Sequence, residues 1–318
     1  MKKVIGLIVI IVVVIGLIVF ISFVNHKIKL KDEDALFKTN GKIVEVNGHH
    51  MNVYLSGNPN SDFTLVFMSG AGTCSPTLDF KTLYSLFEKD YQIAVVEKAG
   101  YGFSDISDIS RDIDTILFET RESLNQAGVT NHKYILFPHS MSGIEALYWA
   151  NKYPNEIKGI VGLDLSVPAA YQNTKINTFL LSAAKFGADI GLTRFLPYLV
   201  DSSSAIKDGN LTEEEKELYR VIFYRRTATT SMINEAKTIK ANAKKLEQID
   251  ETNAPMLFFI SNGDGTGYSK EEWRSFGVGY LANKQNGKYQ FLDCSHYVHN
   301  IAYQQIYEES IKFINQLK

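Results

Sequence analysis

The chain has 318 residues, of which 45% are hydrophobic, and its formal net charge is −2 at pH 7. That length suits one α/β domain with an insertion. The nearly neutral charge provides no basic field for nucleic acid, and Lys and Arg with interleaved aromatic residues form no stripe, so no nucleic-acid partner is expected.

The two cysteines, Cys74 and Cys294, are too few for a disulfide framework. Both fall in loops at one edge of the predicted sheet, where they could reach each other, but free thiols are expected.

An uninterrupted apolar run extends from Val4 to Val24, after a short tail of residues 1–3. A transmembrane helix needs about 20 such residues, whereas the apolar core of a cleaved signal peptide has about 7–15 and ends at small residues. The residues Phe23-Val24-Asn25-His26 offer no cleavage site of that kind. The run therefore predicts a retained single-pass anchor in the cell membrane, with the lipid bilayer as a partner.

Lysines flank both ends of this run, with Lys2 and Lys3 before it and three more between residues 27 and 31. Counting Lys and Arg therefore does not decide the orientation. A very short basic N-terminus before a long apolar run resembles a bacterial signal anchor, which implies that the following domain lies on the extracytoplasmic side. A tether over residues 25–40 would then span at most ~50 Å when fully extended.

The first part of a core domain is expected over residues 41–166. Strands at 42–46 and 51–55, joined around Asn47-Gly48, predict a hairpin. Apolar strand-like runs then alternate with amphipathic helical patterns up to about Leu165. This alternation predicts parallel βαβ units.

Residues 167–253 have a helical period, and no strand-length apolar run in them is followed by another. Acidic residues 213–215 after Thr212 mark one helix start. The pattern predicts a helical insertion between the sixth and seventh core strands. The core would resume over residues 254–318.

The most informative segment joins the apolar run 134–138 to small residues that open a helix, with Ser140 at the bend. A tight strand-to-helix bend exposes a hydroxyl and needs small residues two positions before and after it. With Ser140 at the bend, these positions hold Pro138 and Ser142, whereas with Ser142 at the bend one of them would hold the bulky Ile144. Ser140 is therefore the candidate nucleophile. The alternative is a helix N-cap serine.

The residues Pro138-His139-Ser140-Met141-Ser142 resemble the Gly-x-Ser-x-Gly nucleophile elbow of the α/β-hydrolase family, with Pro138 and Ser142 at the glycine positions. The segment from Glu97 to Asp105 is similar to the Asp-x-Arg-Gly-x-Gly-x-Ser segment of the same family. The resemblance spans about 41–318 apart from the insertion. It implies a mostly parallel eight-stranded sheet with helices on both faces, and a helical cap after strand 6 that selects the substrate.

A serine nucleophile needs a histidine base and a carboxylate that orients it, and in this family the chain order is Ser, acid, His. Asp264 follows the apolar run 254–260, and His296 follows the last strand-like run, just before a helix expected from about Val298 to Leu317. These are the candidate carboxylate and base. Asp164, which also ends a strand-like run, is the reserve carboxylate.

His299 lies one helical turn after His296 and is the reserve base. The two histidines have the spacing of a metal pair, but no third ligand is evident, so no metal site is expected. No cofactor is expected either.

The oxyanion hole is expected to combine two backbone N–H groups. One would belong to Met141, directly after the nucleophile. The apolar run 63–68 leads into Ser69-Gly70-Ala71-Gly72, a loop whose glycines let the backbone curve. The family resemblance implies that Ala71 supplies the second N–H, with Gly72 as the alternative.

Together these residues predict a serine hydrolase that forms an acyl-enzyme, most simply on a small-molecule carboxylic ester. Apolar and aromatic side chains in the insertion fit such a substrate; they are Phe179, Leu180, Leu181, Phe186, Phe195, Leu196 and Tyr198. One alternative is a peptidase similar to the proline iminopeptidases, in which Glu213, Glu214 and Glu215 would bind a substrate amine. Another is a non-catalytic receptor or scaffold on the same fold.

Overall fold

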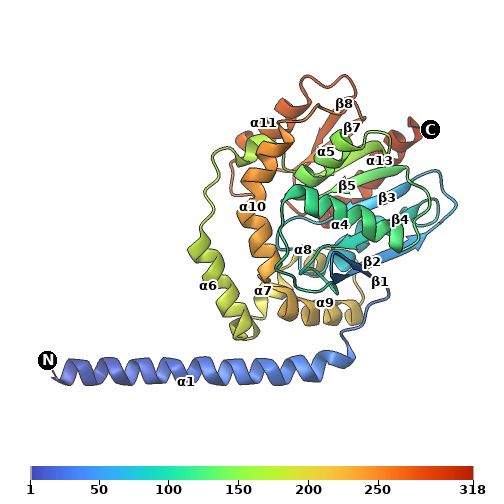
Figure 1. Cartoon of the computed structure of the whole chain (residues 1–318). Coiled ribbons are helices and arrows are strands. Elements are labelled where there is room, and N and C mark those ends of the chain that lie inside the picture. The colour runs from blue at the N-terminus through green and yellow to red at the C-terminus, as the bar shows by residue number, and fades with distance from the viewer. Residues whose placement is uncertain (1, 318) are drawn as a thin grey trace.

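The computed structural model describes residues 2–317 and contains one sheet of eight strands in the order β1-β2-β4-β3-β5-β6-β7-β8 (Figure 1). Met1 and Lys318, the outer ends of the expected segments 1–3 and 254–318, lie outside the described residues. Only the β1–β2 and β2–β4 pairs are antiparallel. The predicted fold class is thus confirmed. The strands are β1 Lys42–Val46, β2 His49–Gly57, β3 Thr64–Met68, β4 Gln92–Glu97, β5 Tyr134–Pro138, β6 Ile157–Leu163, β7 Met256–Ile260 and β8 Gly287–Phe291.

The β1–β2 hairpin turns at Asn47 and Gly48, where the sequence predicts it. Both residues have positive φ, at 56° and 79°. Two-residue hairpin turns of the mirror-image type require this, and Asn-Gly adopts it at little cost. The local sequence alone therefore sets the register of the first strand pair.

Alternate side chains of the central strands enter two separate apolar cores. Leu65 and Phe67 of β3 belong to one core, and Val66 and Met68 belong to the other. One face of the sheet is covered by α4 (Ile113–Gln126), α5 (Ser142–Lys152) and α11 (Lys270–Leu281), and the opposite face by α3 (Lys81–Tyr84), α12 (Val298–Ile301) and α13 (Tyr303–Asn315). The short α2 (Pro76–Asp79) precedes α3. The single helix expected over 298–317 is therefore broken, at Ala302.

Only helices lie between β6 and β7 in the described chain, and we call this segment, residues 164–255, the insert. The predicted helix start at Thr212 is present, because Thr212 and Glu215 form a reciprocal capping box. The helices of the insert are η2 Pro168–Tyr171, α6 Thr178–Asp189, η3 Leu192–Phe195, α7 Tyr198–Asp201, α8 Ser204–Lys207, α9 Glu213–Arg226 and α10 Thr230–Leu246.

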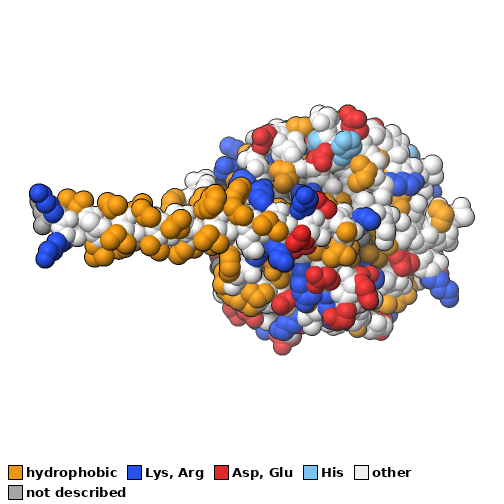
Figure 2. Space-filling view, turned by 90° about the horizontal axis from the view of Figure 1, so that it is seen from below, with side chains coloured by type: hydrophobic (Ala, Val, Ile, Leu, Met, Phe, Trp, Pro, Cys, Tyr) orange, Lys and Arg blue, Asp and Glu red, His pale blue; other side chains and the backbone are white. Residues whose placement is uncertain are grey.

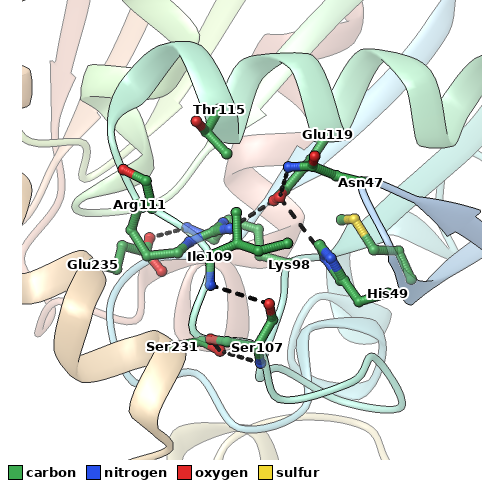
Figure 3. A network of polar contacts seen from close by, with 12 residues as sticks. Asn47, His49, Lys98, Ser107, Ile109, Arg111, Thr115, Glu119, Ser231 and Glu235 are labelled. Atoms are coloured by element: carbon green, nitrogen blue, oxygen red, sulfur yellow. Dashed lines mark hydrogen bonds and ion pairs between the residues drawn. The ribbon is translucent and has the colours of Figure 1, made fainter.

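A buried polar network joins the insert to the core domain (Figure 3). Arg111 donates to Glu119 of α4 over 2.6 Å, and both side chains are almost fully buried. Lys98 forms buried ion pairs with Glu145 of α5 and Glu235 of α10. Buried charges are costly unless they are paired. These pairs therefore hold α10 in one position against the core.

The first helix, α1, extends from Lys2 to Asp32 and is followed by the short η1 (Glu33–Ala35). It is long and apolar enough to cross a membrane, and its apolar window has no buried part (Figure 1). The helix does not end with the apolar run at Val24, as the sequence analysis expects. It continues through eight further residues, so most of the predicted tether 25–40 is helical.

Candidate active site

Ser140 lies at a sharp bend between β5 and α5. Its φ is 55°, a left-handed conformation that is rare for a residue with a side chain. The loop after β3 approaches closely, because a Cβ placed on Gly70 would lie only 2.6 Å from the Ser140 Cβ. In the described chain the Ser140 hydroxyl has no hydrogen-bond partner. Backbone strain and a free hydroxyl at a strand end are the features of a nucleophile elbow.

Ser142, the other serine of the motif, is engaged in structure. Its hydroxyl donates to the carbonyls of Met68 and His139 at 2.7 and 2.9 Å, and its side chain is fully buried. These bonds tie the start of α5 to the end of β3. The register that places Ser140 at the bend therefore agrees with the geometry.

His296 is held by Asp164, which follows β6. The two side chains are 2.6 Å apart, from His296 Nδ1 to Asp164 Oδ2. The second carboxylate oxygen of Asp164 accepts from the Trp273 indole and from the backbone N–H of Ser261, both at 2.7 Å. Three donors therefore hold the carboxylate of Asp164 in place. An N–H at Nδ1 leaves Nε2 of His296 as the proton acceptor.

The side chain of Asp264, the first candidate for this role, does not contact His296. It is exposed, and its carboxylate accepts from the Asn262 amide at 3.0 Å within its own turn. Only its backbone carbonyl contacts His296, through the His296 N–H at 2.9 Å. Asp264 lies four residues beyond the end of β7, whereas Asp164 directly follows β6. The structure thus brings the reserve carboxylate, Asp164, to the histidine in place of Asp264.

Ser140, His296 and Ala71 line one cavity of about 540 Å³. This volume is in the range of small-molecule sites. The remaining lining is mostly aromatic or uncharged: His139, Ser166, Ala170, Tyr171, Asn173, Thr174, Gly265, Thr266, Gly267, Tyr268, Trp273 and Tyr297. None of the described lining residues is an Asp or Glu.

The candidate oxyanion donors are on two adjacent loops. Within residues 2–317, the N–H groups of Met141 and Ala71 have no hydrogen-bond partner in the protein. The N–H of Gly72 is directed at the Tyr101 phenol instead. Ala71, and not the alternative Gly72, therefore has the N–H that is available to a ligand.

Comparison with known families identifies the family to which this chain belongs. The family described as serine aminopeptidase S33 matches residues 59–276, which include Ser140 and Asp164. The chain belongs to this family. Serine aminopeptidase S33 proteins are α/β hydrolases, so the match agrees with the sheet order and with the resemblance of the elbow motif.

Two proteins of Bacillus subtilis (strain 168) are similar to this S33 family member. The uncharacterized protein YbdG is 36% identical over 302 residues, covering 93% of this chain and 92% of its own. The uncharacterized protein YqjL is 26% identical over 246 residues, covering 76% and 79%.

Solved structures share the fold at low sequence identity. The haloalkane dehalogenase DbeA from Bradyrhizobium elkani USDA94 has a TM-score of 0.63 at 13% identity, covering 87% of this chain and 97% of its own. Cfl2 from Burkholderia cenocepacia has a TM-score of 0.63 at 16% identity, covering 86% and 95%. These similarities establish the fold of the S33 family member and nothing about its substrate.

His299, the reserve base, is not in the cavity lining. Its Nε2 bonds to Asp79 at 2.8 Å, and both side chains are buried. His139 lies between the two other histidines, with ring centroids 4.6 Å from His296 and 4.7 Å from His299. Burial and these two neighbours hold the pKa of His139 well below its usual range. His139 is therefore neutral and donates from Nε2 to the His296 carbonyl at 3.1 Å.

The depressed pKa of His139 predicts a stability loss in acid. Below about pH 6.5 the unfolded chain binds a proton at this residue that the folded chain does not, so the free energy of unfolding falls by up to about 1.4 kcal/mol per pH unit. His139→Gln keeps an N–H donor but cannot titrate. Urea unfolding in detergent between pH 7.5 and 5 should show a shallower pH slope for this variant. Parallel slopes would contradict the prediction.

The oxyanion loop is also linked to the insert. The Tyr101 hydroxyl, which faces Gly72, donates to Glu235 of α10 at 2.9 Å. The sequence of the segment from Glu97 to Asp105 gives no sign of this link, because Glu235 lies 134 residues from Tyr101. The contact sets the position of the loop that carries Ala71.

Both cysteines are free, as expected. Cys74 is buried, and burial raises the pKa of its thiol to about 12. Partial burial raises the pKa of Cys294 to about 11. Both groups are therefore neutral thiols near pH 7, and neither is a competing nucleophile.

Proposed function

We propose that this protein is a membrane-anchored serine hydrolase that cleaves carboxylic esters. The observation that carries the proposal is one cavity lined both by Ser140, whose hydroxyl is unbonded in the described chain, and by His296, which is held by a buried Asp164. The proposed anchor is α1, and the hydrolase domain lies on the extracytoplasmic side.

The proposed reaction has two steps. The Ser140 oxygen attacks the ester carbonyl while Nε2 of His296 takes the hydroxyl proton, and Asp164 stabilises the resulting imidazolium. The N–H groups of Met141 and Ala71 hold the oxyanion. The proton then passes from His296 to the leaving alcohol, and an acyl group remains on Ser140. Water that loses its proton to His296 releases the acid and restores the serine.

The cavity lining favours an ester over an aminopeptidase substrate. Binding a substrate ammonium calls for a carboxylate in the site, and the described lining contains none. The three glutamates that could serve a peptidase are at the start of α9. Glu213 pairs with Lys216, and Glu215 pairs with Lys81 and caps the helix. None of the three lines the cavity.

A fluorophosphonate probe and a substrate panel test this proposal on the full chain in detergent. The wild type should be labelled and the Ser140→Ala variant should not. The wild type should also hydrolyse short-chain p-nitrophenyl esters and leave aminoacyl p-nitroanilides intact. Hydrolysis of the anilides would favour the peptidase. If the wild type resists labelling, a non-catalytic receptor or scaffold is the better explanation.

A further inference from the structure

Contacts between α1 and the insert fix the insert at the level where the apolar run of α1 ends. The hydroxyl of Ser22 donates to the Ile190 carbonyl at 2.6 Å, although the two are 168 residues apart. Ser22 lies two residues inside the run that ends at Val24. Since a helix rises 1.5 Å per residue, Ile190 lies about 3 Å inside the end of the run. The insert therefore reaches the boundary of the proposed bilayer.

An arginine of the insert holds α1 in this position. Arg194 of η3 donates to His26 at 2.8 Å and binds both carboxylate oxygens of Glu33 at 2.7 and 2.8 Å. The Arg194 side chain is almost buried. Such two-pronged Arg–carboxylate bonds are among the stronger polar contacts in proteins. They hold α1 and the insert as one unit.

The apolar side chains of the insert that the sequence analysis assigns to the substrate do not line the cavity, and most of them are exposed beside α1 instead. On α6, Phe179 is 82% exposed and Phe186 is 56% exposed, and they continue in Leu180, Phe195, Leu196 and Tyr198. We call these six residues the apolar surface. In Figure 1, α6 stands at the side of the domain that faces the N-terminal part of α1. Figure 2 shows hydrophobic side chains that continue from α1 onto the adjoining domain. Exposed apolar patches of this kind mark interaction sites.

Cations accompany the apolar surface at the same level. A groove of about 550 Å³ between α1 and the insert is lined by Lys27, Arg225 and Arg226, together with Asp189 and apolar side chains. Asp189 pairs with Lys185, and Arg225 pairs with Asp34. Lys27 and Arg226 form no ion pair within the described residues. Their charge is complementary to the phosphate of anionic phospholipids.

We propose that the apolar surface docks on the bilayer that holds α1, with α6 in the interface and anionic headgroups beside Lys27 and Arg226. An apolar helix face next to basic residues is how proteins lie on a lipid surface. The docking rests on the proposed anchor, and the substrate class that follows from it rests on the proposed hydrolytic function. Tyr171, Asn173 and Thr174 line the cavity directly before α6 begins at Thr178. Docking therefore brings the cavity to lipid, and the substrate class is acyl esters of membrane lipids.

Tryptophan fluorescence in vesicles tests the docking without requiring activity. The full chain is reconstituted in phosphatidylcholine vesicles with 30% phosphatidylglycerol, with or without bromine near the headgroup end of the acyl chains. The variants are Phe179→Trp and Phe186→Trp, and the matched control is Phe118→Trp, an exposed position on α4. The native Trp149 and Trp273 are buried and form a common background. We expect brominated lipid to quench the added signal at least twofold at 179 and 186, with no quenching at 118.

Three results would overturn the docking proposal. The first is equal quenching at all three positions. The second is a blue shift at 179 and 186 that needs no lipid and grows with protein concentration, because a second copy of the chain would then cover the surface. The third is a chain that does not float with the vesicles, which would also remove the proposed anchor.

An activity measurement separates the substrate class from the docking itself. The double variant Phe179→Ser/Phe186→Ser should hydrolyse vesicle-borne lipid esters at least fivefold more slowly than the wild type and leave soluble p-nitrophenyl esters unaffected. Phe118→Ser is the control. An equal loss on both substrates would overturn the lipid-ester assignment. If the wild type cleaves neither substrate, the proposed function fails, while the quenching result still decides the docking.

Discussion

Replacing Asp164 with asparagine is expected to lower kcat/KM for ester hydrolysis about 10³- to 10⁴-fold. The asparagine amide can no longer accept the Nδ1 proton of His296 as a carboxylate does, so the imidazole loses the tautomer that leaves Nε2 free. The imidazolium formed during attack also loses its counter-ion. Steady-state kinetics on a p-nitrophenyl ester measure the effect, and retained fluorophosphonate binding at long exposure shows that Ser140 is still accessible.

The matched control is Asp264→Asn. Its carboxylate is exposed and bonds only within its own turn, so activity should stay within about threefold of the wild type. Loss of activity in Asp264→Asn with retention in Asp164→Asn would reverse the assignment. It would mean that the working enzyme rearranges the loop after β7 so that Asp264 takes the histidine.

Replacing Glu119 with glutamine is expected to destabilise the protein by about 3–5 kcal/mol. The reason is Arg111, whose side chain is fully buried and whose Nε and second terminal nitrogen have no hydrogen-bond partner in the described chain. Glu119 is the carboxylate that bonds to it. Without that charge the buried guanidinium loses its direct ion-pair partner. Urea unfolding of the full chain in detergent, followed by the fluorescence of the native tryptophans, measures the loss.

An exposed glutamate in an ion pair provides the comparison. Glu213 pairs with Lys216 on the surface, and its side chain is 81% exposed. Glu213→Gln should change the free energy of unfolding by less than about 1 kcal/mol. Equal effects at 119 and 213 would show that the Arg111 pair contributes no more than a surface contact.

Local sequence was sufficient to predict the elements that local chemistry dictates. The hairpin at Asn47-Gly48 follows from turn preference, and the bend at Ser140 follows from a strand-like run next to small residues. The capping residues of α9 mark its start in the same way. The alternation of strands and helices was sufficient for the class of sheet, because each parallel pair needs a crossover helix.

The choice between Asp164 and Asp264 depends on distances that a sequence does not contain. Each follows a buried strand, and β6 and β7 are neighbours, so both carboxylates reach the same edge of the sheet. Two hydrogen-bond donors that lie 97 and 109 residues after Asp164 decide the choice. The Trp273 indole and the Ser261 N–H both donate to Asp164, whereas Asn262 takes Asp264 into a local turn. The signal that the sequence offered is that Asp164 directly follows its strand, whereas Asp264 lies four residues beyond the end of its own.

The continuity of α1 past the apolar run was also beyond local prediction. Lys27 to Asp32 could form either a helix or a flexible linker, and the contacts of Arg194 with His26 and Glu33 favour the helix. Those contacts join residues more than 160 positions apart.

If α1 is the proposed membrane anchor, its unbroken course to Asp32 and its contacts with Arg194 have a kinetic consequence. A domain on a flexible linker samples a large volume of solution, whereas a domain joined to its anchor by a continuous helix keeps a fixed orientation relative to that helix. Collisions with the proposed lipid ester would then depend on lateral diffusion in the plane of the membrane, so turnover should follow the surface density of the ester and not its bulk concentration.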